Sequence, residues 1–449
     1  MTSVLDSILL QNNFSTPAIR SIWSDDNKIS KQLAVEAALA KIEGDLGIIP
    51  KSAADKIVEK AKVDNFDFLS LQKESAEKRH SLIALIHALQ EEVGGKEGDF
   101  VHYGVTTQDI VDTGIMLQTK EAYNIILDHT KDLISTLAKL TKEHRSTLMI
   151  GRTHGIHAIP ITFGFKLSIW LDELLRSQRR LKQLLENDVF VGSISGAVGS
   201  YASFFGRGRE VEKAVLKELG LAVPNISWQP SRDRFSEFAS VLGIFSGTLG
   251  KIGRELFTLM KTEIDEVHEP FKKGEVGSST MPQKRNPALI EGLASLTQPV
   301  FKDVDLMFQS LLIDGERDAI HWRNEWVALP EITSYLDAQI VNATYILSGL
   351  KVNQDKMLDN LNKQGALPYS ERIMFEVGLK LGKQTAHEIV YQAAMTALEE
   401  NKDFIDLVYS DERVRLNFTK EDILSWVDPK NNIGECLEKV DEVLSQVTI

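Results

Sequence analysis

Residues 114–144, GIMLQTKEAYNIILDHTKDLISTLAKLTKEH, decide the fold class of this 449-residue chain. Apolar side chains recur through the stretch at steps of three, four and seven residues. They are Met116, Tyr123, Ile126, Leu133, Leu137 and Leu140. Such steps place side chains on one face of an α-helix, whereas a half-buried strand would need alternation. The stretch therefore predicts one long amphipathic helix.

The spacing of proline predicts more helices of this length. No proline occurs in residues 51–159, 231–269 or 369–428. Proline costs about 3 kcal/mol inside a helix, so long intervals without it permit long helices. Nearer the N-terminus, Thr16 and Pro17 fit the cap and the first position of a shorter helix.

Residues 249–267, LGKIGRELFTLMKTEIDEV, continue the helical pattern. The apolar face is expected to comprise Leu249, Ile252, Leu256, Leu259 and Val267. Gly247, Gly250 and Gly253 share one helical face. Because they lack the spacing of a phosphate-binding loop, they predict close packing against a neighbouring helix.

Strand-like alternation is nearly absent from the sequence. The best candidate is the short piece VFVGSIS at residues 189–195. We therefore expect an all-α protein with a central bundle of long helices and smaller helical domains at both ends. The expected domains are 1–103, 104–350 for the bundle, and 351–449.

Composition narrows the possible partners. The formal net charge of −13 argues against non-specific nucleic-acid binding, which needs a positive field. Cys436 is the only cysteine, which fits a reducing cytoplasm and leaves no thiolate cluster for a metal. No uncharged run is long enough to span a membrane. We expect a cytoplasmic protein without membrane segments.

Residues 277–287, GSSTMPQKRNP, crowd hydrogen-bond donors into one loop. Ser278, Ser279, Lys284 and Asn286, together with the backbone amides, are suited to hold an anion. A Ser–Lys pair also suits acyl transfer, but neither a Ser-x-x-Lys helix motif nor a GxSxG elbow accompanies it. Anion binding is therefore the preferred interpretation.

Two further polar segments interrupt the helices. Thr106, Thr107 and Gln108 lie at the start of a helix, whose N-terminus attracts a carboxylate; an ordinary capped helix is the alternative. His154 and His157, in GRTHGIHAIP, suit either acid–base chemistry or burial. Because no third ligand accompanies them, we expect no metal site, and no other cofactor.

Residues 229–237, QPSRDRFSE, form a third such segment. Gln229, Arg232 and Arg234 surround Asp233 there. A charge cluster of this kind is usually a solvated surface turn, but it is equally suited to orient a substrate carboxylate.

Taken together, these segments resemble the fumarase/aspartase superfamily. GSSTMPQKRNP matches each fixed position of that family's GSSxMPxKxNP signature, and GRTHG and TTQDIVDT match its two other blocks in the family's order. The resemblance covers about residues 19–331. It implies a homotetramer with a 20-helix core, in which three subunits build each active site.

The resemblance also implies a reaction and a set of roles. A base removes a proton beside a carboxylate, an aci-carboxylate carbanion forms, and a bond one carbon further on breaks. Ser278 matches the base, and His154 matches the histidine that acts as, or supports, the general acid. Lys284 and Asn286 match residues that bind the stabilising carboxylate, where fixed donors favour the developing charge. The other positions taken as substrate-binding are Thr106, Thr107, Gln108, Thr153, His157, Gln229, Arg232, Ser279, Met281 and Arg317.

Within the superfamily, the chain resembles adenylosuccinate lyase and 3-carboxy-cis,cis-muconate cycloisomerase. His80 matches the second catalytic histidine of the former, and GERDAIH at 315–321 resembles its substrate segment. Trp322 and Trp326 stand where that lyase has a serine and an arginine for the nucleotide phosphate. An indole cannot bind a phosphate dianion, and leaving the dianion without a partner is costly. HWRNEWVALPE instead resembles the cycloisomerase.

We therefore expect a lyase or cycloisomerase acting on a small succinyl-type dicarboxylate or tricarboxylate without a nucleotide phosphate. Cleavage of a C–N bond with release of fumarate is the leading version. Cycloisomerisation of a carboxymuconate and true adenylosuccinate cleavage are the alternatives. A crystallin-like structural role would tolerate loss of the base loop or the histidine, and both are present.

Overall fold

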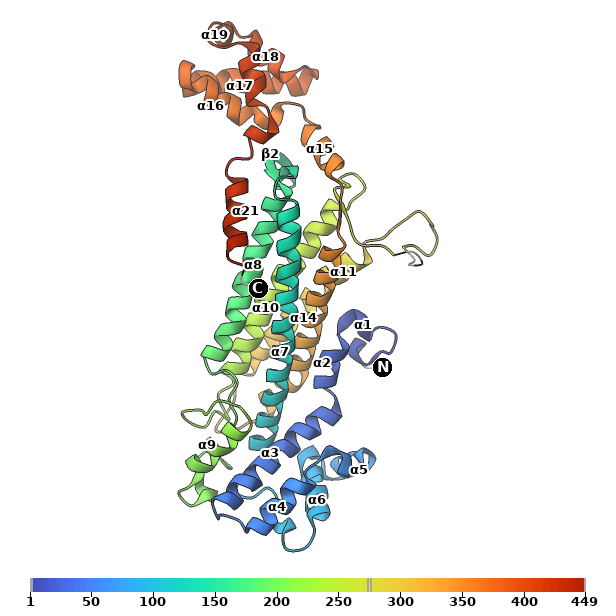
Figure 1. Ribbon diagram of the computed structural model, residues 1–449, viewed down its shortest axis with the longest axis vertical. Helices are drawn as coiled ribbons and strands as arrows, with labels where there is room; N and C mark the ends of the chain where they lie inside the picture. The colour runs from blue at the N-terminus through green and yellow to red at the C-terminus, as the bar shows by residue number, and fades with distance from the viewer. Residues whose placement is uncertain (1–2, 273, 275–276, 448–449) are drawn as a thin grey trace. The chain divides into compact units, whose positions relative to one another are not determined.

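The computed structural model of the protein describes residues 3–272, 274 and 277–447. The chain divides into two compact units. Unit 1 comprises Met1–Thr130, Arg176–Gly250 and Ser295–Val341, and unit 2 comprises Lys131–Leu175, Lys251–Ala294 and Asn342–Ile449. Helices dominate both units (Figure 1), which confirms the predicted all-α class. The borders of the three domains expected from the sequence stay a prediction.

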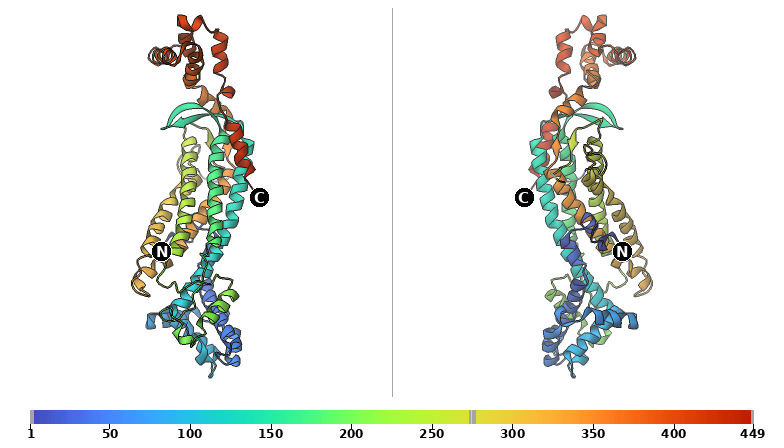
Figure 2. Two further views of the ribbon diagram at one scale, coloured as in Figure 1. Left: turned by 90° about the vertical axis from the view of Figure 1, so that its left-hand side faces the viewer. Right: turned by 90° about the vertical axis from the view of Figure 1, so that its right-hand side faces the viewer.

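Four long helices contain four of the five borders between the units, and the fifth lies in a shorter helix. The four long helices are α7 (Thr107–Glu143), α8 (Phe163–Glu186), α10 (Asp233–Leu259) and α14 (Asn324–Ser348). Figure 2 shows the chain from two further sides, and long helices are visible in both views. All six apolar positions expected on one face of residues 114–144 are buried in α7, which confirms that prediction. Within unit 1, His129 Nδ1 of α7 lies 2.6 Å from Asp337 Oδ1 of α14.

Unit 1 adds shorter helices to these. They are α1 (Gln11–Phe14), α2 (Pro17–Ile22), α3 (Asp25–Asp45), α4 (Lys51–Lys60), α5 (Phe68–Lys78), α6 (Ser81–Val93), α9 (Gly208–Glu218), α12 (Thr297–Gln309) and α13 (Ala319–Trp322). The predicted cap of α2 is confirmed: the Thr16 hydroxyl accepts from the Ile19 N–H, and Pro17 is the first helical residue.

Unit 2 contains the strands and the C-terminal helices. These elements are β1 (Leu148–Thr153), β2 (Ile156–Thr162), β3 (Val267–His268), β4 (Lys351–Val352), α11 (Ala288–Ser295), α15 (Gln354–Asn362), α16 (Ser370–Leu381), α17 (Lys383–Glu400), α18 (Phe404–Ser410), α19 (Glu412–Arg415), α20 (Lys420–Trp426) and α21 (Cys436–Ser445). Strands β1 and β2 form an antiparallel hairpin, and β3 pairs with β4. Helices α16 to α20 enclose a core that includes Ile373, Ile389 and Val408.

Residues 189–195, the best strand candidate in a sequence with little alternation, do not form a strand. Only Val191 makes a bridge there, to Ala222, because the segment otherwise bonds to neighbouring side chains and loops. The hairpin that does form has proline at position 160, in β2, and carries the GRTHG block at its tip. Its local pattern is too irregular for the alternation rule to detect.

Helix α10 packs closely through its glycines, as predicted. A Cβ on Gly250 would lie 2.2 Å from Thr297 Oγ1 of α12, and one on Gly253 would lie 3.0 Å from the Ala294 nitrogen of α11. The helix ends at Leu259, so Val267 is not on its apolar face but in β3; that part of the prediction is wrong. The other four expected positions are fully buried.

Among the residues that the structure describes, no helix combines the length and the apolar character that crossing a bilayer requires.

Candidate active site

The residues expected to bind or transform a substrate fall into two groups along the chain. Seven lie in unit 1: His80, Thr106, Thr107, Gln108, Gln229, Arg232 and Arg317. Eight lie in unit 2: Thr153, His154, His157, Ser278, Ser279, Met281, Lys284 and Asn286.

Thr106 and Arg317 meet at the start of α7. The Arg317 guanidinium donates from Nη1 to Thr106 Oγ1 at 3.0 Å and from Nη2 to the Ala197 carbonyl at 2.6 Å. Asp109, in the first turn of the helix, accepts the Thr106 N–H at 3.1 Å. Arg317 is exposed, and Thr106 and Thr107 are partly exposed. A guanidinium, two hydroxyls and the positive end of a helix dipole therefore face solvent together, which suits a carboxylate.

His80 lies next to this cluster as the N-cap of α6. Its Nδ1 accepts the Ile83 N–H at 3.2 Å, which assigns the proton of a neutral imidazole to Nε2. That Nε2 lies 3.5 Å from Thr107 Oγ1. The cap therefore fixes the ring so that its N–H is presented to the threonines, as a proton donor to a bound substrate must be.

Asp109 anchors the segment that faces the start of α7. It is fully buried, and its carboxylate accepts from the Ser193 hydroxyl at 2.8 Å and from the backbone N–H groups of Ser195 and Gly196 at 3.0 and 2.8 Å. Burial raises the pKa of Asp109, while these bonds act in the opposite direction. Sequence reasoning missed this role, although the spacing of Asp109 within TTQD fits a third-position capping residue.

The prediction that Arg232 binds substrate is wrong. Its side chain is completely buried, and every N–H is used inside the chain: two donate to Asp112, two to Glu325 and one also to the Gln229 carbonyl. Trp322 completes the network by donating from Nε1 to Asp112 Oδ1 at 2.8 Å. Burial lowers the pKa of a guanidinium, but the two carboxylates outweigh it and raise the pKa of Arg232.

Gln108 and Gln229 are buried beside this network. Gln108 donates from Nε2 to Asp112 Oδ2 at 2.9 Å, and Gln229 donates from Nε2 to the Gly196 carbonyl at 2.9 Å. The Oε1 atoms of both are buried without a partner among the described residues. Their expected contact with substrate stays a prediction. Residues 229–237 had two interpretations, a solvated surface turn or a group that orients a carboxylate. Because Gln229 and Arg232 are buried, the solvated turn is wrong.

His154 lies at the tip of the β1–β2 hairpin. Its backbone is left-handed, with φ of 54°, and Gly155 follows with φ of 80°, which together reverse the chain. Thr153 and His154 are both exposed. Among the described residues, the His154 side chain has no hydrogen-bond partner, so the imidazole is available to another group.

His157 and Arg152 face each other across the same hairpin. Arg152 makes two bonds to the buried Glu266, at 3.0 and 2.5 Å, and Asn360 Nδ2 donates to the same carboxylate at 2.8 Å. Burial, followed by the charge of Arg152, lowers the pKa of His157. The neutral imidazole is therefore favoured, and its buried Nδ1 has no partner among the described residues.

The loop at 277–287 closes on itself. The Asn286 N–H donates to the Gly277 carbonyl at 3.3 Å, and a Cβ on Gly277 would lie 2.6 Å from the Lys284 carbonyl, so only glycine fits. Ser278 Oγ accepts the Met281 N–H at 3.1 Å and the Thr280 N–H at 3.4 Å. Two donors at this oxygen favour its negatively charged form.

The cationic and amide side chains of this loop are exposed. Among the described residues, neither the Lys284 nor the Asn286 side chain has a hydrogen-bond partner. The Ser279 hydroxyl has one contact there, with Thr280 Oγ1 at 3.5 Å. The loop's C-terminal end is held by Glu269, whose carboxylate accepts the N–H groups of Leu289 and Ile290 at 3.1 and 3.0 Å. The loop therefore exposes unpaired donors while its C-terminal end is held in place.

The structure joins His80, Thr106, Thr107 and Arg317 in one cluster within unit 1. In unit 2, the loop at 277–287 and the hairpin tip share no hydrogen bond among the described residues. No three His, Cys, Asp or Glu side chains of the described residues gather in a way that could hold a metal ion.

Comparison with known proteins places these features in a family. A family model described as "Lyase" matches residues 10–301, and one described as "Adenylosuccinate lyase C-terminus" matches residues 366–443. The chain is 54% identical to an N-acetyl-S-(2-succino)cysteine lyase of Enterococcus italicus, over 98% of this chain and 97% of the relative. It is 49% identical to a lyase of the same name from Dickeya dadantii, over 98% and 97%.

A solved structure shows the same architecture. The 3-carboxy-cis,cis-muconate lactonizing enzyme of Pseudomonas putida matches with a TM-score of 0.89 and 32% identity, over 96% of this chain and 97% of that chain. The family model covers more than half of the chain, and both relatives match it almost from end to end. The protein therefore belongs to the fumarase/aspartase superfamily and is an enzyme of its lyase class.

Proposed function

We propose that the protein cleaves the C–S bond of a 2-succinylated thiol, of which N-acetyl-S-(2-succino)cysteine is the preferred example, and releases fumarate and the thiol. The observation that carries this proposal is that two relatives, 54% and 49% identical over nearly their full length, bear that name. The sequence alone favoured a nitrogen leaving group in the same elimination. The proposal keeps the elimination and replaces nitrogen with sulfur.

The two tryptophans themselves support a substrate without a phosphate. Trp322 is buried and its only N–H is used by Asp112, and Trp326 packs against it at a centroid distance of 5.1 Å. Neither side chain offers a charge-assisted bond to a phosphate dianion. A succinylated cysteine derivative carries carboxylates and an amide but no phosphate, which fits this arrangement.

The proposed reaction is a β-elimination. Ser278, as the alkoxide, removes a proton from the succinyl carbon next to one carboxylate, and the electron pair is held as an aci-carboxylate. Lys284 and Asn286 stabilise that carboxylate, where charge develops. Thr106, Thr107 and Arg317 hold the second carboxylate. The C–S bond then breaks, and the electron pair leaves on sulfur.

Sulfur makes the last step less demanding than nitrogen would. A thiol has a pKa of about 8.5, so it leaves as a thiolate without prior protonation, whereas an amine must accept a proton. His154 and His80 are proposed to supply the proton that the departing group takes up. The general acid is therefore expected to contribute less with a thioether than with an amine substrate.

We propose that a homotetramer brings these groups together, with each site shared between subunits. The free donors of the loop at 277–287 and the unpartnered His154 support this assembly, because both are exposed in a single chain. A cytoplasmic location, expected from the single cysteine, is part of the same proposal.

Three substrates test the function. The purified protein is incubated with N-acetyl-S-(2-succino)cysteine, adenylosuccinate or a carboxymuconate, and fumarate absorbance and free thiol are followed together. The expected result is fumarate and thiol in equal amounts from the first substrate. If adenylosuccinate yields fumarate while N-acetyl-S-(2-succino)cysteine releases no thiol, the substrate is a nucleotide. If only the carboxymuconate reacts and yields a lactone, the protein is a cycloisomerase.

A further inference from the structure

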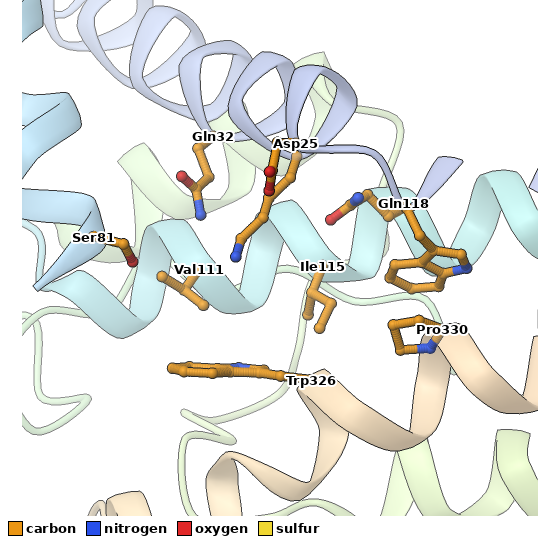
Figure 3. A pocket seen from close by; sticks show the side chains of 10 residues that line it. Asp25, Gln32, Ser81, Val111, Ile115, Gln118, Trp326 and Pro330 are labelled. Carbon is orange, nitrogen blue, oxygen red and sulfur yellow. The ribbon is translucent and has the colours of Figure 1, made fainter. Parts of the chain in front are cut away.

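A small cavity opens in unit 1 next to the His80 cluster. It has a volume of about 160 Å³ and lies among α3, α6, α7 and α14 (Figure 3). Its lining includes Asp25, Lys28, Gln32, Val111, Ile115 and Trp326. A second cavity, of about 200 Å³, shares Asp25, Lys28, Gln32 and Ser81 with it. We call the first cavity the indole pocket.

The indole pocket continues the surface on which the substrate carboxylate is proposed to bind. Ser81 follows His80 directly in the chain. Val111 and Ile115 lie one and two turns beyond Thr107, on the same face of α7. A molecule held at Thr107 with its leaving group directed along the helix would therefore place that group in the indole pocket.

Gln32 is a buried amide that lacks a partner. Its side chain is only 6% exposed, and among the described residues nothing accepts from it or donates to it. Figure 3 shows it projecting from α3 into the indole pocket. Gln118, across the same pocket, does have a partner, since its Nε2 donates to the Ile22 carbonyl at 2.7 Å. The Gln32 amide is open to this pocket, where a ligand amide can take the place of water as its partner.

Lys28 adds one cation to the same lining, which also contains the carboxylate of Asp25. Among the described residues, no carboxylate lies within ion-pair distance of its ammonium group. Lys31, one turn further along α3, is paired with Glu121. The comparison shows that an unpaired lysine is not general for this helix. One free ammonium suits one ligand carboxylate.

Trp326 supplies an apolar surface between these polar groups. Its indole is 41% exposed, and Figure 3 shows the ring lying along the pocket below Val111 and Ile115. Trp322 supports it edge-on, with the ring planes at 69°. Aromatic faces bind methyl groups and thioether sulfur favourably.

We propose that the indole pocket binds the leaving-group half of the substrate, an N-acylated amino acid thiol. Lys28 pairs with its carboxylate, Gln32 pairs with its acetamide, and Trp326 packs against its sulfur and methyl groups. This inference rests on the proposed function and adds the part of the chain that selects the thiol. A free α-ammonium has no carbonyl to accept from Gln32 Nε2 and would lie near the Lys28 cation, so the N-acetylated substrate is preferred.

Three succinylated thiols and two variants test the assignment. The thiols are those of N-acetylcysteine, cysteine and N-acetylcysteamine, the last of which lacks the carboxylate. Lys28→Met is expected to lower kcat/KM for the N-acetylcysteine substrate about tenfold to a hundredfold, mainly through KM, and to leave the N-acetylcysteamine substrate nearly unchanged. Gln32→Leu is expected to reduce the preference for N-acetylcysteine over cysteine. Lys31→Met, on the same helix, is the matched control. It should change neither kcat/KM for the N-acetylcysteine substrate nor the preference for N-acetylcysteine over cysteine.

A binding measurement keeps the assignment separate from turnover. Calorimetric titration of the intact protein with N-acetylcysteine should show binding that is weakened in Lys28→Met and retained in Lys31→Met, with Lys28→Arg as a folded variant that keeps the charge. Suppose that the wild type cleaves N-acetyl-S-(2-succino)cysteine. If the two variants then lower kcat/KM equally for all three substrates, or change it for none of them, the pocket assignment is overturned and the proposed function stands. If no succinylated thiol is cleaved and N-acetylcysteine does not bind, the proposed function and the pocket assignment both fall.

Discussion

Residues 229–237 and residues 277–287 both crowd donors into a short polar stretch, yet the chain treats them in opposite ways. Arg232, in the first, is completely buried, and all of its donors are used by Asp112, Glu325 and a carbonyl. Lys284, in the second, is exposed and has no side-chain partner among the described residues. A donor whose hydrogen bonds are all made within the chain, here called saturated, stabilises the fold. A donor without a partner in the chain, here called unsaturated, is available to a ligand. The difference separates structural from functional polar residues more clearly than residue type does.

The largest expected effect is the loss of kcat when the loop at 277–287 is changed. Ser278→Ala should lower kcat by about two to four orders of magnitude, because the proposed base is removed and the remaining donors cannot take up the proton. His154→Ala should cause a loss of the same order. Steady-state kinetics and the melting temperature should be measured together. Full activity in Ser278→Ala would show that the loop has been given the wrong role.

The second prediction concerns the saturated region. Arg232→Met should destabilise the protein by about 3–5 kcal/mol, because Asp112 and Glu325 are left buried without their cation. Thermal unfolding measures this loss, and Lys284→Met is the matched control with an expected change near zero. An unchanged melting temperature for Arg232→Met would remove the contrast between the two regions.

A buried acid without a hydrogen-bond partner among the described residues sharpens the comparison. Both carboxylate oxygens of Glu43 are buried without a partner among the described residues, and burial, followed by Glu36, raises its pKa to about 8. The group is therefore protonated in the folded state but ionised in the unfolded state above about pH 4.5. Its contribution to stability is present at low pH and is lost as the pH rises toward 8.

Glu43→Leu should remove this dependence. Between pH 5 and pH 8 the wild type should lose about 2–4 kcal/mol more stability than the variant. Melting temperatures at the two pH values measure it, and Glu91→Leu, at an exposed position of α6, is the control. Parallel pH dependence in wild type and Glu43→Leu would contradict the raised pKa.

The smallest expected effect is at the edge of the saturated network. Trp322→Phe removes the N–H that donates to Asp112 Oδ1 and should cost about 1–2 kcal/mol. Because Trp322 also supports Trp326, a modest rise in KM for the N-acetylcysteine substrate should accompany the loss. Trp228→Phe, whose Nε1 donates instead to the Gly192 carbonyl, should lower stability without that rise in KM.

The sequence predicts the helical part of the fold well, because its evidence is local. The buried face of α7, the cap of α2 at Thr16 and the packing of Gly250 all follow from spacing and residue type. The end of α10 was placed too late, since Val267 continues the apolar period although it lies in a strand. Periodicity cannot distinguish a helix from a later element that happens to fall in phase.

The polar residues were harder to interpret, because their roles depend on partners distant in sequence. Arg232 is matched by Asp112 and Glu325, which are 120 and 93 residues away. A lone glutamine on a helix, such as Gln32, does not by itself indicate a binding role until its burial is known. Its position does carry a signal: Gln32, Glu36 and Glu43 repeat at helical steps on the buried face of α3. Polar residues at core positions deserve a search for partners or ligands.

Mixing two inactive variants gives the most direct test of the central claim that unsaturated groups from different copies of the chain form one site. Ser278→Ala and His154→Ala are purified separately, mixed under mild dissociating conditions, and allowed to reassociate. The account predicts that each variant alone is nearly inactive and that the mixture recovers a measurable part of the wild-type activity, because some sites then contain both intact residues. Mixed oligomers that form but stay inactive would contradict it.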